Sequence, residues 1–552
     1  MTHPIERLSP AQLKAALNSE REIAVLDVRE EGVTARRRLL YATVAPVGRL
    51  GYLVPSLVPR TSTPIVLVDT AGEATPRAAA MLQSFGYTDV ALLEGGVDAW
   101  GRAGFEVFTG TNVASKAFGE ILEHALDTPN IDAATLRARQ AAGENLVVLD
   151  SRPFNEFRNM NIPGGLDCPG AELVYRALAA APDPATLIVV NCAGRTRSIL
   201  GAQSLVNAGV PNPVAALTGG SMSWLLNEFT LEHAQIRTAP RPDASTAARA
   251  RELALRVAER AGVQVIDAAG LARLVQEADV RTLYCFDVRD PQEFEAGHRP
   301  GFRHAPGGQL VQAVDEFVAT LRARIVLADD DGVRARMTAS WLQQHGSFEV
   351  YVLDEQDVPP QWEAGRDVRP LRRLGGRLAW LDADQVQAGL EAGTLQVIDV
   401  DHSLPFRRGH LPGARFVAAS ALLERLPELQ RAGQAVVLAS VDGTLAGVVA
   451  GELQAAGHAV GVLLGGTARW KSLGLPLERG DAGNLTGDDD AWYSPYHVPP
   501  ESAVAAMHAY MSWQLQLPEQ VRRDGPTPMQ VVDFGTSTQA RSQERLAALR
   551  GS

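Results

Sequence analysis

The stretch VVNCAGRTRS, residues 189–198, joins an apolar strand to the start of a helix. Its first residues are apolar and β-branched, and ILGAQSLV (199–206), which follows, favours a helix. Between the two elements lie Cys192, Gly194 and the cations Arg195 and Arg197. A strand that runs into a helix through small residues is typical of a parallel α/β unit. Cys192 is therefore expected at the carboxyl end of a strand, where open α/β sheets bind ligands.

Two phrases around this stretch recur along the chain. The first is a strand, Gly-Gly and a tryptophan: ALLEGGVDAW (91–100), AALTGGSMSW (215–224) and VLLGGTARW (462–470). Its spacing places a further copy at VYVLDEQDVPPQW (350–362), which keeps the strand and the tryptophan but lacks the glycines. The second is a buried strand ending in aspartate, with an arginine two residues later in three copies: AVLDVRE (24–30), VVLDSRP (147–153), YCFDVRD (284–290) and QVIDVDH (396–402).

The shared order of these phrases indicates four tandem units. Each unit alternates short apolar strands with amphipathic helices, which predicts a parallel sheet covered on both faces. We therefore expect an α/β fold of four such domains and a helical C-terminal tail. The expected boundaries are 5–110 (repeat one), 128–237 (repeat two), 262–366 (repeat three), 376–479 (repeat four) and 480–552 (the tail).

Helix signals open each unit and appear between the units. A Ser or Asp in the N-cap position begins the segments 9–17, 132–140, 267–275 and 382–390. Further helices are expected at 113–126 and 247–261, and the Pro-rich stretch 238–246 reads as a linker. In the tail, ESAVAAMHAYMSWQLQL (501–517) has an apolar stripe, which favours packing on the body of the protein or on a second subunit.

The turn around Cys192 suits a nucleophile that attacks a small anion. Its backbone N–H groups and the helix N-terminus are positive, and Arg195 and Arg197 add full charges. These features favour the thiolate, which is the reactive form of cysteine. Alignment of the strands places Thr70, Asp329 and Ser440 opposite Cys192, so repeats one, three and four are predicted to be inactive.

For several other residues of the four units, the sequence favours a structural role. Asp150 and Arg152 are expected to fix neighbouring loops, and Arg152 to support the Cys192 loop, because the same pair recurs in units without a cysteine. Cys168 is interpreted as structural, with a resolving thiol as the alternative, and Cys285 as a core residue. His298 and His410 precede Pro-Gly turns and are also interpreted as structural.

Composition limits the remaining classes. The net charge of −12 argues against general binding of nucleic acid. Three cysteines do not make a disulfide framework, and no secretory signal or long apolar run is evident, so a cytoplasmic protein with no membrane contact is expected. No Cys/His cluster has zinc spacing, and we expect neither a metal nor a cofactor.

The loop CAGRTRS (192–198), the upstream Asp-x-Arg, the Pro-Gly turn and the downstream Gly-Gly-x-x-x-Trp together resemble the rhodanese (sulfurtransferase) family. The resemblance covers all four units, but the loop matches in repeat two alone. It implies that Cys192 takes a sulfane sulfur from a small anionic donor such as thiosulfate and passes it to cyanide or a thiol. It also implies that the loop residues bind the donor: Ala193, Gly194, Arg195, Thr196, Arg197 and Ser198.

Two alternatives remain open at this point. Cysteine phosphatases place five residues between the cysteine and the arginine, whereas four separate Cys192 from Arg197, which favours sulfur over phosphoryl transfer. A persulfide relay or binding module fed by a partner protein would use the same loop. The three units without cysteine are expected to serve as scaffold, to cover the site or to build a homodimer with the tail, and repeat one or repeat three is expected to complete the pocket.

Overall fold

The computed structural model describes residues 5–354 and 362–550, and these residues form two compact units. One unit consists of the chain up to Thr111, Val318–Thr320 and Arg369–Tyr493, so that it contains repeats one and four. The other consists of Asn112–Phe317, Leu321–Val368 and the chain from Ser494 onward, so that it contains repeats two and three together with most of the tail. The chain therefore pairs its inner two repeats and its outer two.

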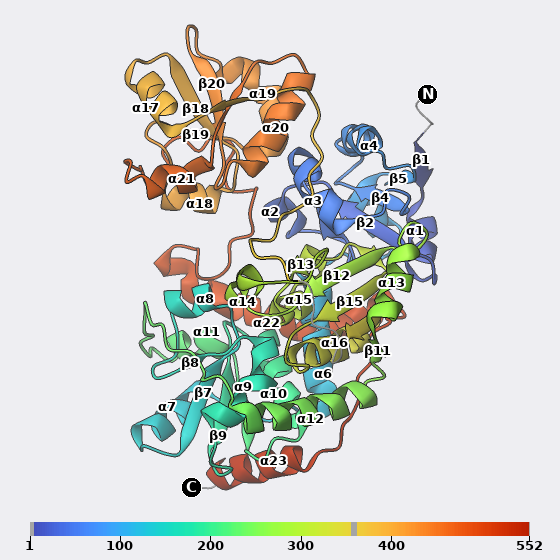
Figure 1. Ribbon diagram of the computed structural model, residues 1–552, viewed down its shortest axis with the longest axis vertical. Helices are drawn as coiled ribbons and strands as arrows, with labels where there is room; N and C mark the ends of the chain where they lie inside the picture. Colours follow the sequence, from blue (N-terminus) through green and yellow to red (C-terminus); the bar gives the residue numbers. More distant parts are fainter. Residues whose placement is uncertain (1–4, 355–361, 551–552) are drawn as a thin grey trace. The chain divides into compact units, whose positions relative to one another are not determined.

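Repeat two is a parallel sheet with helices on both faces (Figure 1). Its strand order is β6 (Asn130–Ile131), β10 (Val214–Leu217), β9 (Leu187–Asn191), β7 (Leu146–Asp150) and β8 (Leu166–Asp167). The surrounding helices are α7 (Ala133–Ala141), α8 (Phe154–Asn159), α9 (Leu173–Ala180), α10 (Thr196–Ala208), α11 (Gly220–Leu226) and the short 3-10 turn η2 (Gly170–Glu172). Alternate residues of β9 enter two different hydrophobic clusters, as a central parallel strand requires.

The other three repeats have the same order of parallel strands. In repeat three it is β11 (Gln264–Ile266), β16 (Glu349–Leu353), β15 (Arg324–Ala328), β12 (Leu283–Asp287) and β13 (Arg303–His304). In repeat four it is β17 (Ala379–Leu381), β21 (Gly461–Leu463), β20 (Ala435–Ala439), β18 (Leu395–Asp399) and β19 (Arg415–Phe416). Repeat one has β1 (Glu6–Leu8), β5 (Val90–Leu93), β4 (Ile65–Val68) and β2 (Ile23–Asp27), with β3 (Thr43–Val44) on β2.

The helices of these repeats alternate with the strands. Repeat one has α1 (Pro10–Leu17), α2 (Glu31–Thr34), η1 (Val47–Arg49), α3 (Leu50–Leu57), α4 (Thr75–Ser84) and α5 (Gly96–Arg102). Repeat three has α13 (Ala268–Gln276), α14 (Pro291–Ala296), α15 (Gly307–Gln312), η3 (Val314–Glu316) and α16 (Arg334–His345). Repeat four has α17 (Ala383–Glu391), α18 (Ser403–Arg408), α19 (Ala419–Leu429), α20 (Thr444–Ala455) and α21 (Gly466–Ser472). The predicted fold class of four parallel-sheet α/β units is confirmed.

The helix signals of the sequence are also found. Ser9, Asp132, Asp267 and Asp382 each accept a hydrogen bond from a backbone N–H group of the helix that follows, as N-cap residues do. Helix α6 spans Val113–Leu126, and α12 spans Ala244–Arg260. The boundaries expected for the four repeats stay predictions.

The Gly-Gly-x-x-x-Trp phrase has one structural role in three repeats. Trp100, Trp224 and Trp470 are buried, and each indole N–H donates to the carbonyl six residues later, at 2.9–3.0 Å. Repeat three differs, because Trp362 is 43% exposed and lies with its ring under the Arg289 guanidinium. The expectation that repeat three keeps this tryptophan is therefore wrong in structural terms. Residues 355–361, where the glycines were sought, lie outside the described residues.

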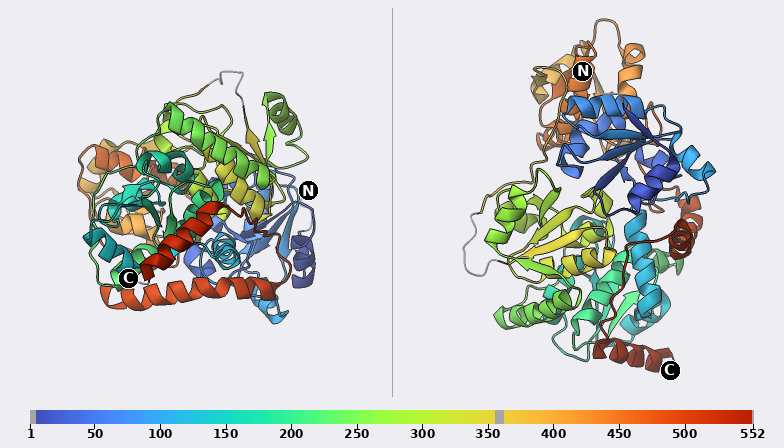
Figure 2. Two further views of the ribbon diagram at one scale, coloured as in Figure 1. Left: turned by 90° about the horizontal axis from the view of Figure 1, so that it is seen from below. Right: turned by 90° about the vertical axis from the view of Figure 1, so that its right-hand side faces the viewer.

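The tail packs on the unit of repeats two and three. Its long helix α22 (Pro500–Asp524), orange-red in Figure 2, lies against α6. The last helix, α23 (Ser537–Arg550), lies against β10, where the Ser542 hydroxyl accepts a hydrogen bond from the Val214 N–H at 2.9 Å. The expected packing on the body is thus found, and a homodimer through the tail stays a prediction. Among the described helices, none has the length and apolar character needed to cross a membrane.

His345, in the last turn of α16, is a buried imidazole whose ring nitrogens have no hydrogen-bond partner among the described residues. Its ring packs near Phe118 and Phe348, with centroids 5.8 and 5.9 Å away. Burial lowers the pKa of His345 to about 4, although Asp315 acts in the opposite direction. The folded protein therefore keeps this side chain neutral where an unfolded chain would protonate it.

Acid should destabilise this unit through His345. The unfolded chain, with an ordinary pKa of about 6.5, binds a proton that the folded state does not, so this stability is complete above that value and is lost as the pH falls toward 4. Between about pH 7 and pH 5 we expect a loss of about 2 kcal/mol from this residue. Chemical denaturation at both pH values measures it. His345→Leu, which removes the unpartnered nitrogens, should lose correspondingly less, and equal losses in both proteins would contradict the assignment.

Candidate active site

Cys192 follows directly after β9 and lies at the carboxyl end of the repeat-two sheet. Ala193, Gly194 and Arg195 form the turn that leads into α10. The cysteine is only 2% exposed, and its thiol lies 3.5 Å from the Ser198 hydroxyl, to which it donates a hydrogen bond. The Ser198 hydroxyl in turn donates to the Arg195 carbonyl at 2.8 Å. The thiol is therefore held inside the turn.

The strand registers correct one residue of the sequence alignment. Asp150 pairs with Asn191 in repeat two, and Asp27 pairs with Val68 in repeat one. The residue after the central strand is therefore Asp69, and Asp69 rather than Thr70 is the counterpart of Cys192. The sequence alignment was off by one residue because it matched the polar Asp69 with the polar Asn191. The structural counterpart of Asn191 is the apolar Val68.

Repeats three and four keep the predicted counterparts. Asp287 pairs with Ala328, which places Asp329 next, and Asp399 pairs with Ala439, which places Ser440 next. Repeats one and three therefore both have an aspartate at this position, and repeat four has a serine.

These counterparts reveal what the turn binds. The Asp69 carboxylate accepts hydrogen bonds from the backbone N–H groups of Gly72, Ala74 and Thr75. The Asp329 carboxylate accepts from Gly332 and Ala335, at 3.0 and 2.8 Å. A carboxylate thus binds the turn in repeats one and three. The residues at the corresponding positions of repeat two are Arg195, Arg197 and Ser198, which are three, five and six residues after Cys192.

The Gly-Gly turn holds this loop from the other side. The N–H groups of Ser221 and Met222, at the start of α11, donate to the carbonyls of Cys192 and Ala193 at 2.8 and 3.1 Å. Gly220 has φ +53°, and a Cβ there would lie 2.2 Å from the Cys192 carbonyl oxygen. Only glycine allows this approach. Repeats one and four have the same contact at Gly96 and Gly466.

Arg195 is bound by two carboxylates of α6. Its guanidinium donates to both oxygens of Glu120 at 2.8 Å, and it also pairs with Glu123. Burial opposes the charge of Arg195, but these carboxylates and the Cys192 thiolate outweigh it and raise its pKa. Burial raises the pKa of Glu123 despite Arg195. The sequence predicted Arg195 to be a ligand for a donor, and the structure adds two competing anions.

Arg197 is bound by one carboxylate and one amide. Its guanidinium donates to both oxygens of Glu156 in α8, at 2.7 and 2.9 Å, and to the side-chain oxygen of Gln309 at 3.3 Å. Burial opposes its charge, but Glu156 and the Cys192 thiolate outweigh it and raise the pKa of Arg197. Gln309 belongs to α15, so repeat three is the neighbour that reaches this loop within the unit.

Asp150 and Arg152 form an ion pair that supports the strand end from which the Cys192 loop begins. Arg152 donates to both oxygens of Asp150, at 2.8 and 2.7 Å, and to the Met160 carbonyl at 2.6 Å. Asp150 also accepts from the Asn191 side chain, next to Cys192, at 2.9 Å. The equivalent pairs Asp27–Arg29 and Asp287–Arg289 form the same contacts in the silent repeats. This recurrence favours the structural role that the sequence analysis preferred.

The tail contributes residues that sequence reasoning missed. The Tyr496 hydroxyl donates to the Ala193 carbonyl at 3.0 Å and lies 2.9 Å from the Ser221 hydroxyl. The Gln514 amide donates to the Thr196 hydroxyl at 3.1 Å, and the Tyr510 ring packs against Gly194. Burial raises the pKa of both tyrosines. Only the apolar stripe of 501–517 hinted at this packing, and it did not indicate the target.

The other cysteines and the two histidines have packing roles. Cys168 is fully buried in a core cluster of repeat two, and burial, together with Glu172, raises its pKa well above the ordinary range. Burial raises the pKa of Cys285 to about 12. His298 and His410 each stack on the phenylalanine four residues earlier and contact its carbonyl, at 2.9 and 2.8 Å.

Known proteins share this arrangement. A family model described as the rhodanese-like domain matches residues 9–103, 132–227, 267–355 and 382–473. A crystal structure of a thiosulfate sulfurtransferase from Pseudomonas aeruginosa is 42% identical, covers 96% of this chain and 100% of its own, and has a TM-score of 0.90. The uncharacterized protein YqhL of Bacillus subtilis (strain 168) is 36% identical over 76 residues, which are 14% of this chain and 59% of that relative's length.

The family model therefore matches well over half of the chain, in four successive copies. Each copy contains the strand, turn and helix from which the Cys192 site is built in repeat two. The chain belongs to the rhodanese family, as a protein of four tandem rhodanese-like repeats.

Proposed function

We propose that the protein is a sulfurtransferase that moves a sulfane sulfur from thiosulfate or a related anion to a thiophilic acceptor, through a persulfide on Cys192. One observation carries the proposal: Cys192 occupies the position at which repeats one and three hold an aspartate carboxylate on backbone N–H groups. A turn that binds an anion around a nucleophilic sulfur suits attack on an anionic donor. The 42% identity to a thiosulfate sulfurtransferase supports the same chemistry.

The first half-reaction is a displacement at sulfur. The Cys192 thiolate attacks the sulfane sulfur of thiosulfate, and a new S–S bond forms while the bond to the sulfonate sulfur breaks. Sulfite leaves with the bonding electron pair. Because the equivalent N–H groups bind Asp69 and Asp329 in repeats one and three, those of Arg195, Arg197 and Ser198 are expected to stabilise the negative charge on the thiolate and on the outer sulfur of the persulfide.

The second half-reaction regenerates the free Cys192 thiolate. A nucleophile such as cyanide or a thiolate attacks the outer sulfur of the persulfide, and Cys192 leaves as the thiolate. Thiocyanate or a new persulfide is the product. No external oxidant or reductant is needed, because in each step the nucleophile supplies the electron pair of the new bond and the leaving group keeps the pair of the broken bond. A free thiolate suits a reducing compartment, and we place the protein in the cytoplasm on that ground.

Two observations favour a second candidate, a persulfide relay fed by a partner protein. Both guanidiniums of the loop already bind carboxylates, Glu120 and Glu156, which an anionic donor must share or displace. Cys192 is also only 2% exposed, under residues of the tail. A relay would need less positive charge at the thiol than a thiosulfate enzyme does.

The persulfide itself is the first test. Wild-type protein treated with thiosulfate should gain the mass of one sulfur atom on the Cys192 peptide, and cyanide should remove it. Cys192→Ser should gain nothing and should turn over at least a thousandfold more slowly, because the serine hydroxyl lacks a base. Cys168→Ser is the matched control and should load normally. An adduct that persists in Cys192→Ser would refute the assignment.

Donor choice separates the two candidates. For a sulfurtransferase, we expect steady turnover with free thiosulfate and cyanide, at a rate comparable to that with cysteine persulfide as donor. For a relay, cysteine persulfide should load Cys192 and thiosulfate should not. Stopped-time mass spectrometry of the Cys192 peptide with each donor measures the two loading rates, and loading by persulfide alone would replace the proposed function with the relay.

Glycine in the Gly-Gly turn should matter for activity only in repeat two. Gly220→Ala and Gly466→Ala each place a Cβ about as close to a loop carbonyl and force a left-handed φ, so each should lower the free energy of unfolding by about 2 kcal/mol or more. Sulfur transfer should fall at least tenfold in Gly220→Ala and stay near wild type in Gly466→Ala, per folded protein. Equal losses of transfer in both variants would contradict the placement of the site.

A further inference from the structure

The loops of repeats two and three have an arginine at the same position. Arg197 is the fifth residue after Cys192, and Arg334 is the fifth after Asp329, its counterpart in the strand register. Each arginine binds a glutamate on the first helix after the aspartate strand of its own repeat: Glu156 for Arg197 and Glu293 for Arg334. The silent repeat has thus kept the cation of the catalytic loop.

Each arginine is also bound from the other repeat. Gln309 of repeat three accepts from Arg197 at 3.3 Å, and Glu172 of repeat two accepts from Arg334 at 2.8 Å. Glu172 and Gln309 occupy equivalent positions in their repeats. Each lies two residues after a glycine, and the N–H of that glycine donates to the carbonyl of the residue after the aspartate strand. The two hydrogen bonds are Gly170 to Ser151 and Gly307 to Val288. The two repeats therefore exchange the same contact reciprocally.

The exchange is fixed by close packing of the backbone. A Cβ on Gly308 would lie 2.9 Å from the Gly170 nitrogen, so the two segments that bear Glu172 and Gln309 touch without side chains between them. In the other unit, Arg49 of repeat one occupies the same position after its proline and donates to the Asp401 carbonyl of repeat four. In repeats one, two and three, the residue at this position thus forms a hydrogen bond with the neighbouring repeat.

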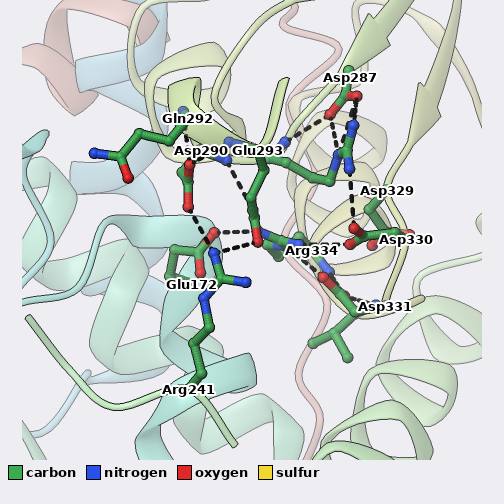
Figure 3. Close-up of polar contacts among 12 residues, drawn as sticks. Glu172, Arg241, Asp287, Asp290, Gln292, Glu293, Asp329, Asp330, Asp331 and Arg334 are labelled. Atoms are coloured by element: carbon green, nitrogen blue, oxygen red, sulfur yellow. Dashed lines mark hydrogen bonds and ion pairs between the residues drawn. The ribbon is translucent and has the colours of Figure 1, made fainter. Parts of the chain in front are cut away.

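The two ends of the exchange differ in charge. Arg334 is fully buried and binds four carboxylates: Glu172, Glu293, Asp330 and Asp331 (Figure 3). Arg197 is 13% exposed and binds the single carboxylate of Glu156, since its partner from the neighbouring repeat is a neutral amide. Among the described residues, one carboxylate therefore contacts Arg197 and four contact Arg334, although three of these four also pair with Arg176, Arg241 or Arg289. An anion near the loop meets fewer carboxylates around the arginine of repeat two than around the arginine of repeat three.

We propose that Gln309, contributed by the silent repeat three, is a specificity-determining residue for the Cys192 site: its neutral amide positions Arg197 without cancelling the charge that an anionic sulfur donor needs. Glu172 is the reciprocal case and contributes to excluding anions from the repeat-three loop. The inference rests on the proposed function for its substrate, but its electrostatic content does not depend on sulfur transfer.

The test adds a carboxylate at this position. Gln309→Glu should raise the KM for thiosulfate, a dianion, at least tenfold and leave kcat within threefold. The KM for cysteine persulfide, which carries a smaller net negative charge, should rise less. Gln309→Ala removes the contact without adding charge and should raise the KM for thiosulfate less than Gln309→Glu does. Gln292→Glu adds the same charge on the exposed surface of repeat three and should change nothing.

A second readout is independent of the proposed function. Iodoacetate and iodoacetamide alkylate a thiolate by the same displacement and differ in charge. The rate of Cys192 alkylation by iodoacetate, divided by the rate with iodoacetamide, is measured by peptide mass spectrometry. This ratio should fall at least fivefold in Gln309→Glu and should not fall in Gln292→Glu. If the alkylation ratio falls in Gln309→Glu but the wild type forms no persulfide on Cys192, the proposed function is refuted and the inference about Gln309 still holds. An unchanged ratio and an unchanged KM in a folded variant, or equal losses with both donors, would overturn the inference.

Discussion

Gly220 approaches the carbonyl of Cys192 so closely that no side chain fits between them, and the loop after β9 takes its form from that contact. Two N–H groups of α11 bind the loop carbonyls of Cys192 and Ala193. In a trans peptide the C=O and N–H groups point in opposite directions, so the N–H groups of the same two peptides, on Ala193 and Gly194, point away from α11. Repeats one and four repeat the contact without a cysteine, which makes the anion-binding turn a property of the fold and the thiol a local addition.

The carboxylates occupy different places around the turns of repeats one, two and three. In repeats one and three an aspartate fills the turn from within, so that no external anion is needed to satisfy its N–H groups. In repeat two the turn holds a sulfur, and the carboxylates of Glu120 and Glu156 are held outside it on the two arginines. The arginines thus remain oriented and charged in the absence of a donor. Their net effect on an anion depends on how many carboxylates surround each one, and this number differs between repeats.

The pairing of repeats two and three and the packing of the tail bring residues from outside repeat two to the Cys192 loop. Repeat three supplies Gln309 to the Cys192 loop, and the tail supplies Tyr496, Tyr510 and Gln514. All of these residues come from segments more than a hundred residues away along the chain. Repeat two on its own would have Cys192 and the turn, but it would lack the amide on Arg197 and the phenol on the Ala193 carbonyl.

The sequence by itself determined the four-unit α/β architecture, the helix N-caps and the place of Cys192 at a strand end, because strand, turn and helix signals are local and recur in the same order. It also marked Asp150 and Arg152 as braces, since the pair recurs in units without a cysteine. Only the tertiary structure decided that Asp69 faces the turn of repeat one, that carboxylates bind Arg195 and Arg197, and that repeat three and the tail reach the thiol. Strand register and long-range contacts depend on how the backbones pack, and an individual glutamate, glutamine or tyrosine carries no local signal of the partner it will find.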